Sequence, residues 1–530
     1  MPRESLPKVT GADVEVGNFI LGGIGMRDTC AEASRRLLRE IIGHPARTDF
    51  ASHSSDSQDW GRRFLASNGG CAYIDLNHLE LCLPETISAF DHVACWQAML
   101  KIARRALRKA NDRLPDGEKI QVIINNSDGL GNSYGSHLNF LVTRRAWDGL
   151  FRSKIHPLLY LAAFQISSIV YTGQGKVGSE NGAPEVAYQI SQRADFFETL
   201  IGEQTTYRRP VVNSRDEPLC GRKRAATVTE GDSHQALARL HVIFYDSNLC
   251  QVANLLKVGV MQIVLAMIEA ERINLDLILD DPLTALRDWS HDPTLEARAR
   301  LVSGEEVTAV ELQLRFFEEA LRFVIYDGCE GIVPRADEIL TLWKDTLHDL
   351  AARNFATLAP RLDWVLKWSI LQGVISERPD LGWDSPEIKH LDLIYSSLND
   401  AEGLYWAYER SGFVERVVTG EQIERFRREP PTDTRAWTRA KLLRWASPEI
   451  AEIDWDYINF KTSTMGYWPS YRTLHLESPL SFTESAAEPI FGRMDATLDD
   501  LLDELGATPE ESSYGTARSY QLPLPISTNN

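Results

Sequence analysis

The segment KVTGADVEVGNFIL, residues 8–21, alternates between apolar and acidic side chains. Val14 and Val16 are separated by Asp13 and Glu15, and this two-residue period predicts a β-strand. Side chains two positions apart on a strand point to the same face, so both carboxylates lie on one side of it. The segment therefore predicts a strand that presents two carboxylates together.

Further acidic positions fall on other predicted strands. The segment CAYIDLNHLELCLPE, residues 71–85, predicts a strand or hairpin with three acidic residues, and the polar stretch NNSDGLGNSYGSHLNF, residues 125–140, leads into an apolar strand. Magnesium prefers oxygen ligands, which carboxylates on neighbouring strands supply without ordering a loop. The candidate metal ligands are Asp13, Glu15, Glu80, Glu85, His137 and Glu217. The alternative, that these are solvent-facing positions of half-exposed strands, stays open.

Three arginines accompany the acidic segments. They are Arg193 in SQRAD, Arg215 in NSRDEP and Arg239 in ARLHV. A guanidinium group suits bidentate recognition of phosphate, whereas the alternative for each is a surface ion pair. Together with the carboxylates, they predict a site for a cation and a phosphate.

The rest of the chain predicts an α+β protein. Helical periodicity predicts helices over residues 31–43, 91–114 and 254–273, and a mainly helical region from about 309 to 400. The proline-containing segment REPPTDTRA, residues 428–436, marks a boundary. It precedes a smaller unit of mixed helix and strand that extends to about residue 505, followed by a polar tail predicted to be disordered.

Composition narrows the class of protein. The chain has 530 residues, 43% of them hydrophobic, and a formal net charge of −19, which disfavours binding to nucleic acid or to an anionic membrane. Seven scattered cysteines form no CxxC pair. This pattern is expected in a reducing compartment and argues against a structural zinc site. No signal-peptide pattern opens the sequence. We therefore expect a soluble cytoplasmic protein.

Several ordered motifs resemble one family. GADVEVG, YIDLNHLELCLPE, NNSDGLGNSYGSHLNFLV, QISQRADF, VVNSRDEP, RLHVIFYDSN, LDWVLKWSILQG and PPTDTRAW occur in the order seen in the family of the Pup ligase and the Pup deamidase/depupylase. The resemblance implies a glutamine synthetase-like fold, in which helices back a curved antiparallel sheet that forms a cradle for ATP and magnesium. It divides the chain into a catalytic domain (1–425), a small C-terminal domain (426–505) and a disordered tail (506–530).

The resemblance also implies roles for individual residues. Asp75 corresponds to the catalytic aspartate, and the six candidate metal ligands correspond to the magnesium and phosphate cradle. The residues expected to face the nucleotide or the terminal carboxylate of the modifier are Arg193, Arg215, Arg239, His241 and Trp455.

Four positions depart from the family pattern. Asp13 stands where glutamate is usual, and Leu138, Leu79 and Leu219 replace the central residue of His-Glu-Asn, the proline of His-Pro-Glu and the histidine after Arg-Asp-Glu-Pro. Loss of a carboxylate from a magnesium site weakens the neutralisation of phosphate, although a neighbour of a ligand can face away from the metal. The departures predict altered or reduced nucleotide chemistry.

The leading hypothesis is a depupylase-like amidohydrolase that acts on Pup or a Pup-like modifier with ATP and magnesium. The second half of the chain resembles depupylases, whereas only 62 positions separate Asp13 from Asp75, closer to the ligase. An ATP-dependent ligase and a catalytically weak Pup- or nucleotide-binding protein are the alternatives. The segment from Arg208 to Arg224 has six basic and two acidic residues, which suit an acidic partner or a solvated loop.

Overall fold

An antiparallel sheet of eight strands organises the molecule. The computed structural model describes residues 6–23, 25–26, 28–47, 60–220, 236–465, 468–492 and 497–509. The strands follow the order β12-β7-β1-β5-β4-β3-β2, and β6 pairs with the far half of β1. Their bounds are β1 Thr10–Leu21, β2 His44–Pro45, β3 Trp60–Phe64, β4 Cys71–Asp75, β5 His78–Cys82, β6 Lys119–Ile123, β7 Ser136–Thr143 and β12 Leu237–Val242. The predicted strand in residues 8–21 is thus the central strand β1.

The strand register separates two faces of this sheet. Asp13 lies opposite His137 of β7 and Cys82 of β5, and Glu15 lies opposite Glu80. The alternate residues of β1, including Val14, point to the other face and are buried in the main hydrophobic core. The sheet therefore carries its acidic residues on one face and packs with the other.

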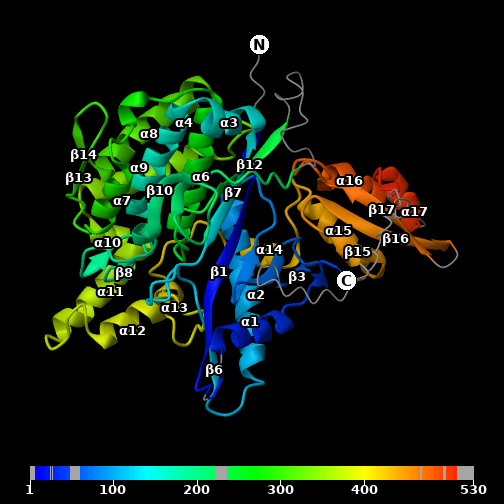
Figure 1. Cartoon of the computed structure of the whole chain (residues 1–530), viewed down its shortest axis with the longest axis horizontal. Coiled ribbons are helices and arrows are strands. Elements are labelled where there is room, and N and C mark those ends of the chain that lie inside the picture. The colour runs from blue at the N-terminus through cyan, green and yellow to red at the C-terminus, as the bar shows by residue number, and fades with distance from the viewer. Residues whose placement is uncertain are drawn as a thin grey trace, which may run out of the picture.

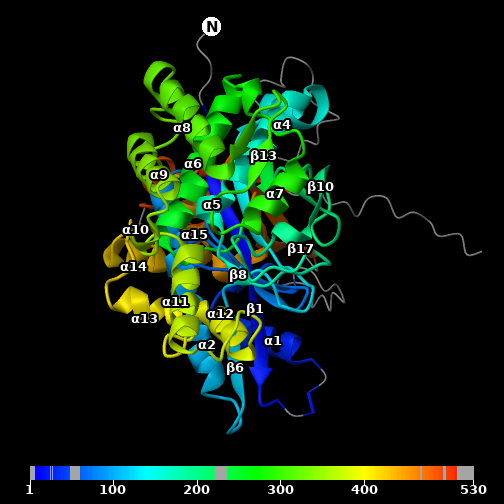
Figure 2. The ribbon, with the colours of Figure 1, turned by 90° about the vertical axis from the view of Figure 1, so that its left-hand side faces the viewer.

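Helices cover the apolar face of the sheet. The two central ones are α2 (Ala89–Asn111) and α6 (Gln251–Glu269), which pack against each other. Figure 1 shows the helices from α4 to α11 on one side of β1 and β7, and in Figure 2 they lie in front of the sheet. The long helices are α1 Thr29–Glu40, α4 Ile155–Ser167, α7 Pro282–Ser290, α8 Ala309–Tyr326, α9 Ala336–Ala351, α11 Asp363–Glu377, α12 Pro386–Tyr395 and α14 Gly420–Arg428. The predicted helical regions are confirmed.

Short elements connect these layers. The short helices are α3 Arg144–Asp148, α5 Ile169–Thr172, α10 Phe355–Leu358 and α13 Leu404–Arg410. The small strand pairs are β8 Lys176–Val177 with β9 Tyr188–Gln189, β10 Phe197–Gly202 with β11 Arg209–Asn213, and β13 Arg298–Arg300 with β14 Glu306–Thr308.

Helix α6 has the length and hydropathy of a membrane span. It is the one helix in the described part of the chain that meets both conditions, and its apolar segment is entirely buried in the protein. Its contacts with α2, α8 and α9 account for that composition.

The C-terminal unit lies on the opposite side of the large sheet from the helices α4 to α11 (Figure 1). It contains α15 Ala436–Trp445, β15 Ile450–Ile453, β16 Tyr457–Met465, β17 Trp468–His475, α16 Glu484–Phe491, α17 Leu498–Glu504 and β18 Thr508–Pro509. Its core shares Phe64, Cys71, Tyr73 and Cys82 with the large sheet. The main hydrophobic core extends to Phe426, and the C-terminal residues of the second core begin at Trp437; the exact boundary at 425/426 stays a prediction.

Two consequences follow for the predicted organisation. The antiparallel sheet, its helical backing and the mixed C-terminal unit confirm the α+β class. The predicted tail begins too early at residue 506, because Thr508 and Pro509 pair with β17. Residues 510–530 lie outside the described residues.

Candidate functional site

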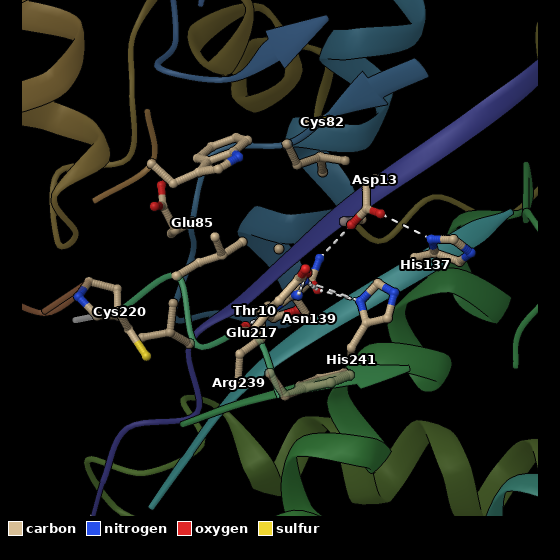
Figure 3. Close-up of a pocket in the computed structure, with 18 of the residues that line it drawn as sticks. Thr10, Asp13, Cys82, Glu85, His137, Asn139, Glu217, Cys220, Arg239 and His241 are labelled. Carbon is tan, nitrogen blue, oxygen red and sulfur yellow. Dashed lines mark hydrogen bonds and ion pairs between the residues drawn. The ribbon is translucent and has the colours of Figure 1, made fainter. Parts of the chain in front are cut away.

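A cavity of about 430 Å³ lies between the acidic face of the large sheet, the segment 215–220 and the C-terminal unit. Its volume is in the range of small-molecule sites. Figure 3 shows residues from β1, β7 and β12 side by side in its wall. Of the predicted site residues, those that line it are Asp13, Asp75, Glu80, Glu85, His137, Arg215, Glu217, Arg239, His241 and Trp455.

Three carboxylates from three adjacent strands converge at this wall, and two of them, Asp75 and Glu80, line the cavity. One oxygen from each of Glu15, Asp75 and Glu80 lies within 4.8 Å of the others. The register explains the cluster: Glu15 of β1 is opposite Glu80 of β5, and Asp75 lies two residues from the partner of Glu80 on β4. A two-residue turn with positive φ at Leu76 and Asn77 joins β4 to β5 and holds Asp75 at the end of the hairpin.

Electrostatics in the cluster favour a cation. Burial, followed by the charges of Asp13 and Glu15, raises the pKa of Glu80 well above its usual range. The Tyr73 hydroxyl donates a 2.6 Å hydrogen bond to Glu80, which only partly offsets this effect. Several carboxylate oxygens around one point are the ligands that a hard divalent cation requires, so the residues present fit magnesium.

Glu85 has a different environment from the cluster. Arg435 Nε lies 2.7 Å from its Oε1, and Arg439 donates to both of its oxygens. Burial raises the pKa of Glu85, but the charges of Arg439 and Arg435 outweigh burial and hold the pKa at about 2. The structure therefore places this predicted metal ligand in a buried ion pair between the sheet and the C-terminal unit, outside the acidic cluster.

Asp13 and His137 belong to a hydrogen-bond network that links β1, β7 and β12 (Figure 3). Asp13 accepts hydrogen bonds from His137 Nδ1 at 3.1 Å and Asn139 Nδ2 at 2.5 Å. Asn139 Oδ1 is 2.8 Å from Arg239 Nη1 and 3.0 Å from His241 Nδ1. Burial, then the charges of Arg239 and His137, lowers the pKa of His241. The network continues from Arg239 to the half-exposed Glu217, whose Oε2 lies 3.1 Å from Arg239 Nη2.

Leu138 does not face the cavity. It lies opposite Ala12 of β1 and Val242 of β12, is 1% exposed and belongs to the main hydrophobic core. The strand alternation that turns His137 and Asn139 toward the cavity turns Leu138 away from it. The predicted effect of Leu138 on the metal site is therefore wrong, because a side chain at this position cannot reach the acidic face.

The remaining predicted residues divide into two groups. Arg215 and Trp455 line the cavity, and the Trp455 ring packs edge-on against Phe64 at 5.3 Å and under the Arg439 guanidinium. Arg193 is fully buried outside the cavity lining and donates to the carbonyl of Ile243 and, at 3.3 Å, to a serine hydroxyl. Burial lowers its pKa to about 9. Its predicted contact with nucleotide stays a prediction.

Sequence reasoning missed several residues of this site. Tyr73, Asn139 and Arg62 line the cavity, and Arg435 closes it from the C-terminal unit. Two of them had a signal: Tyr73 is two residues before Asp75 and Asn139 two residues after His137, so each shares a strand face with a predicted site residue. No local pattern identifies the arginines that bind Glu85, because they lie some 350 positions away along the chain.

Comparison with known proteins assigns the family. The model of the Pup-ligase protein family matches residues 32–459. The chain belongs to this family. The resemblance drawn from the sequence motifs is thereby confirmed.

Members of the Pup-ligase family with both named activities are similar to this chain. It is 35% identical over 425 residues to a depupylase of Acidothermus cellulolyticus, covering 80% of each chain. It is 34% identical to the Pup deamidase/depupylase of Mycolicibacterium smegmatis, covering 75% of each. It is also 34% identical to a Pup–protein ligase of Acidimicrobium ferrooxidans, covering 80% of this chain and 88% of the ligase.

Solved structures of the family share the fold. The complex between Pup and its ligase PafA matches with a TM-score of 0.74 at 26% identity, covering 94% of this chain and 91% of the ligase. PafA in complex with ADP matches with a TM-score of 0.68, also at 26% identity, covering 91% and 95%. These matches extend the family assignment to the C-terminal unit.

Proposed function

We propose that this protein is a depupylase-like amidohydrolase, which cleaves the amide bond at the C-terminal Glu or Gln of Pup or a Pup-like modifier with ATP and magnesium bound. The observation that carries the proposal is the position of Asp75, which lines the cavity and lies within the Glu15–Asp75–Glu80 cluster. Relatives named as depupylases, 34–35% identical over at least three quarters of the chain, support it.

Water and Asp75 carry out different parts of the hydrolysis. The oxygen of water bonds to the amide carbonyl carbon, the C–N bond breaks, and the amine leaves with the proton that water loses. A carboxylate at Asp75 accepts that proton from water in the simplest scheme. Direct attack by Asp75 on the carbonyl carbon is the alternative, and a single turnover in H₂¹⁸O followed by mass spectrometry of the protein distinguishes the two.

The cavity supplies places for both cofactors. Glu15 and Glu80 would hold magnesium beside Asp75, and magnesium neutralises phosphate charge when bound. Arg215 and Arg239 line the wall where phosphate oxygens require donors, and Trp455 offers an aromatic face for a nucleotide base. The ADP complex of a neighbour with the same fold supports nucleotide binding by this protein.

The partner and compartment follow from the same proposal. The Pup complex of a neighbour supports Pup as the macromolecular ligand. The basic segment that would attract an acidic modifier is described only up to residue 220, so Arg222, Lys223 and Arg224 lie outside the described residues. All seven cysteines are free, which supports a cytoplasmic location.

Release of Pup from a labelled conjugate tests the proposal. We expect ATP- and magnesium-dependent release by the parent protein and a loss of roughly 10²- to 10⁴-fold in Asp75→Asn, since the carboxylate that accepts the proton is removed. Asp116→Asn, which makes the same change in an exposed turn, is the matched control. Equal release by the parent and Asp75→Asn, or none by the parent, would contradict the proposal.

A Pup ligase is the second candidate. The short span of 62 positions from Asp13 to Asp75, the identity to a Pup–protein ligase and the fold match to PafA favour it. ADP formation that depends strictly on an added amine acceptor, together with conjugate formation, would establish ligation in place of hydrolysis. Binding of nucleotide and Pup without either reaction would indicate a binding protein.

A further inference from the structure

The carboxylate of Asp13 is fully engaged by neighbours on β7. It is not part of the Glu15–Asp75–Glu80 cluster, although Asp13 and Glu15 share a face of β1. One of its oxygens accepts from His137 Nδ1 and the other from Asn139 Nδ2. Both oxygens of the Asp13 carboxylate are therefore acceptors aimed at β7.

The orientation of Asn139 follows from its other neighbour. A guanidinium group can only donate hydrogen bonds, and Arg239 Nη1 is 2.8 Å from Asn139 Oδ1. The amide oxygen must consequently face Arg239, which leaves the amide nitrogen to donate to Asp13. Arg239 thus fixes Asn139, and Asn139 fixes the carboxylate of Asp13.

The hydrogen bond to this carboxylate in turn fixes the tautomer of His137. A carboxylate only accepts, so Nδ1 of His137 carries a hydrogen, and in the neutral ring the lone pair lies on Nε2. This is the arrangement that orients a metal-binding histidine, with one ring nitrogen donating to a carboxylate and the other free to bind.

The free nitrogen of His137 lies on the Glu15 side of the acidic cluster, although His137, like Asp13, is not one of the three residues that form the cluster. A Cβ at Gly135 would lie 2.9 Å from Glu15 Oε1 and closer still to His137 Nε2. The Gly135 backbone N–H donates to the same Glu15 oxygen at 3.1 Å. The absence of a side chain at Gly135 thus leaves room between the imidazole and the carboxylate of Glu15.

We propose that Asp13 is a positioning residue, which holds His137 so that Nε2 binds the cation of the Glu15–Asp75–Glu80 cluster and which does not bind that cation itself. The proposal rests on the proposed function, since it assumes that the cluster holds a divalent cation. It gives the site one nitrogen among its oxygen ligands. It also assigns the shorter side chain at Asp13 a role in support of His137 in place of direct coordination.

Mn²⁺ titration of the ATP-free protein, followed by electron paramagnetic resonance, tests this proposal without a measurement of activity. We expect Asp13→Asn to weaken Mn²⁺ binding roughly 10- to 100-fold, the range for loss of a group that orients a ligand. In a double-mutant cycle, Asp13→Asn should weaken binding no further once His137→Ala is present. Losses that multiply in the double variant would overturn the proposal, because Asp13 would then act independently of His137.

Spin-echo spectra of bound Mn²⁺ provide the second readout. We expect ¹⁴N coupling in the parent, its loss in His137→Ala and its reduction in Asp13→Asn. Coupling that is absent from the parent, or unchanged in Asp13→Asn, would overturn the positioning role while the proposed hydrolase stands. No binding of Mn²⁺ to the parent would overturn both proposals. If the protein does not release Pup but binds Mn²⁺ with the expected ¹⁴N coupling, the proposed hydrolase is overturned and the positioning role of Asp13 is supported.

Controls separate positioning from folding. Asp116→Asn changes the same charge in an exposed turn and should leave Mn²⁺ affinity and the ¹⁴N coupling unchanged. If Asp13→Asn does not fold, Asn139→Ala replaces it, because it removes the second donor that fixes Asp13. We expect a several-fold weaker affinity that also disappears in the His137→Ala background, and an unchanged affinity would overturn the proposal.

Discussion

Glu80 and Glu85 are buried carboxylates five residues apart, yet their surroundings give them opposite charge preferences. Glu80 lies among other carboxylates, and its pKa is raised by burial and by Asp13 and Glu15. Glu85 lies between two arginines of the C-terminal unit, which hold its pKa at about 2 despite burial. The first environment has a negative charge that a ligand can neutralise, and the second is already neutralised. We thus assign cation binding to Glu80 and a contribution to stability to Glu85, although both lie in one segment.

Removal of the Glu85 charge should have the largest effect on stability. We expect Glu85→Gln to lower the free energy of unfolding by about 3–5 kcal/mol, because it leaves Arg435 and Arg439 buried without a counter-charge. Urea denaturation measures the change. The control Glu338→Gln removes an exposed ion pair with Arg335, for which about 1 kcal/mol or less is expected. Equal losses in the two variants would refute the comparison.

Acid should remove the same contribution from the parent protein. The pKa of Glu85 falls from an ordinary 4.5 to about 2 on folding, and such a shift corresponds to roughly 3 kcal/mol. Because the folded-state pKa is depressed, this stability is present above pH 4.5 and is lost as the pH falls toward 2. The difference in unfolding free energy between the parent and Glu85→Gln should shrink over this window. A difference independent of pH would contradict the ion-pair explanation.

Magnesium should stabilise the protein through the cluster and not through Glu85. We expect a gain of about 2.7 kcal/mol at a concentration one hundred times the dissociation constant, if only the folded state binds. Thermal unfolding with and without Mg²⁺ measures this gain. It should disappear in Glu80→Gln and persist, on a lower baseline, in Glu85→Gln. The reverse pattern would place the cation at Glu85.

Without metal, Glu80→Gln should be slightly more stable than the parent. Because folding raises the pKa of Glu80, the parent loses stability as the pH rises above the ordinary value of 4.5, and glutamine removes this repulsion. We expect a gain of about 0.5–2 kcal/mol at pH 8, typical of relief of strain in a functional site, and a smaller gain at pH 5. Destabilisation at both values would show that Glu80 supports the fold.

The sequence predicts the strands of the sheet more completely than it predicts which residues their side chains contact. The alternation in residues 8–21 identifies β1 and the shared face of Asp13 and Glu15, because strand geometry is local. The same alternation shows that Leu138, between His137 and Asn139, belongs to the apolar face. It cannot distinguish Glu80 from Glu85, since the two arginines that determine the charge of Glu85 come from α15 and the residue before it. The position of Arg193 likewise depends on tertiary packing.

Anomalous diffraction from a crystal soaked in Mn²⁺ tests the distinction between Glu80 and Glu85 most directly. We expect a peak bounded by the carboxylates of Glu15, Asp75 and Glu80, with His137 beside it, and no peak at Glu85. A peak on the Glu85 carboxylate, with Arg435 and Arg439 displaced and the cluster empty, would contradict the assignment of cation binding to the acidic cluster.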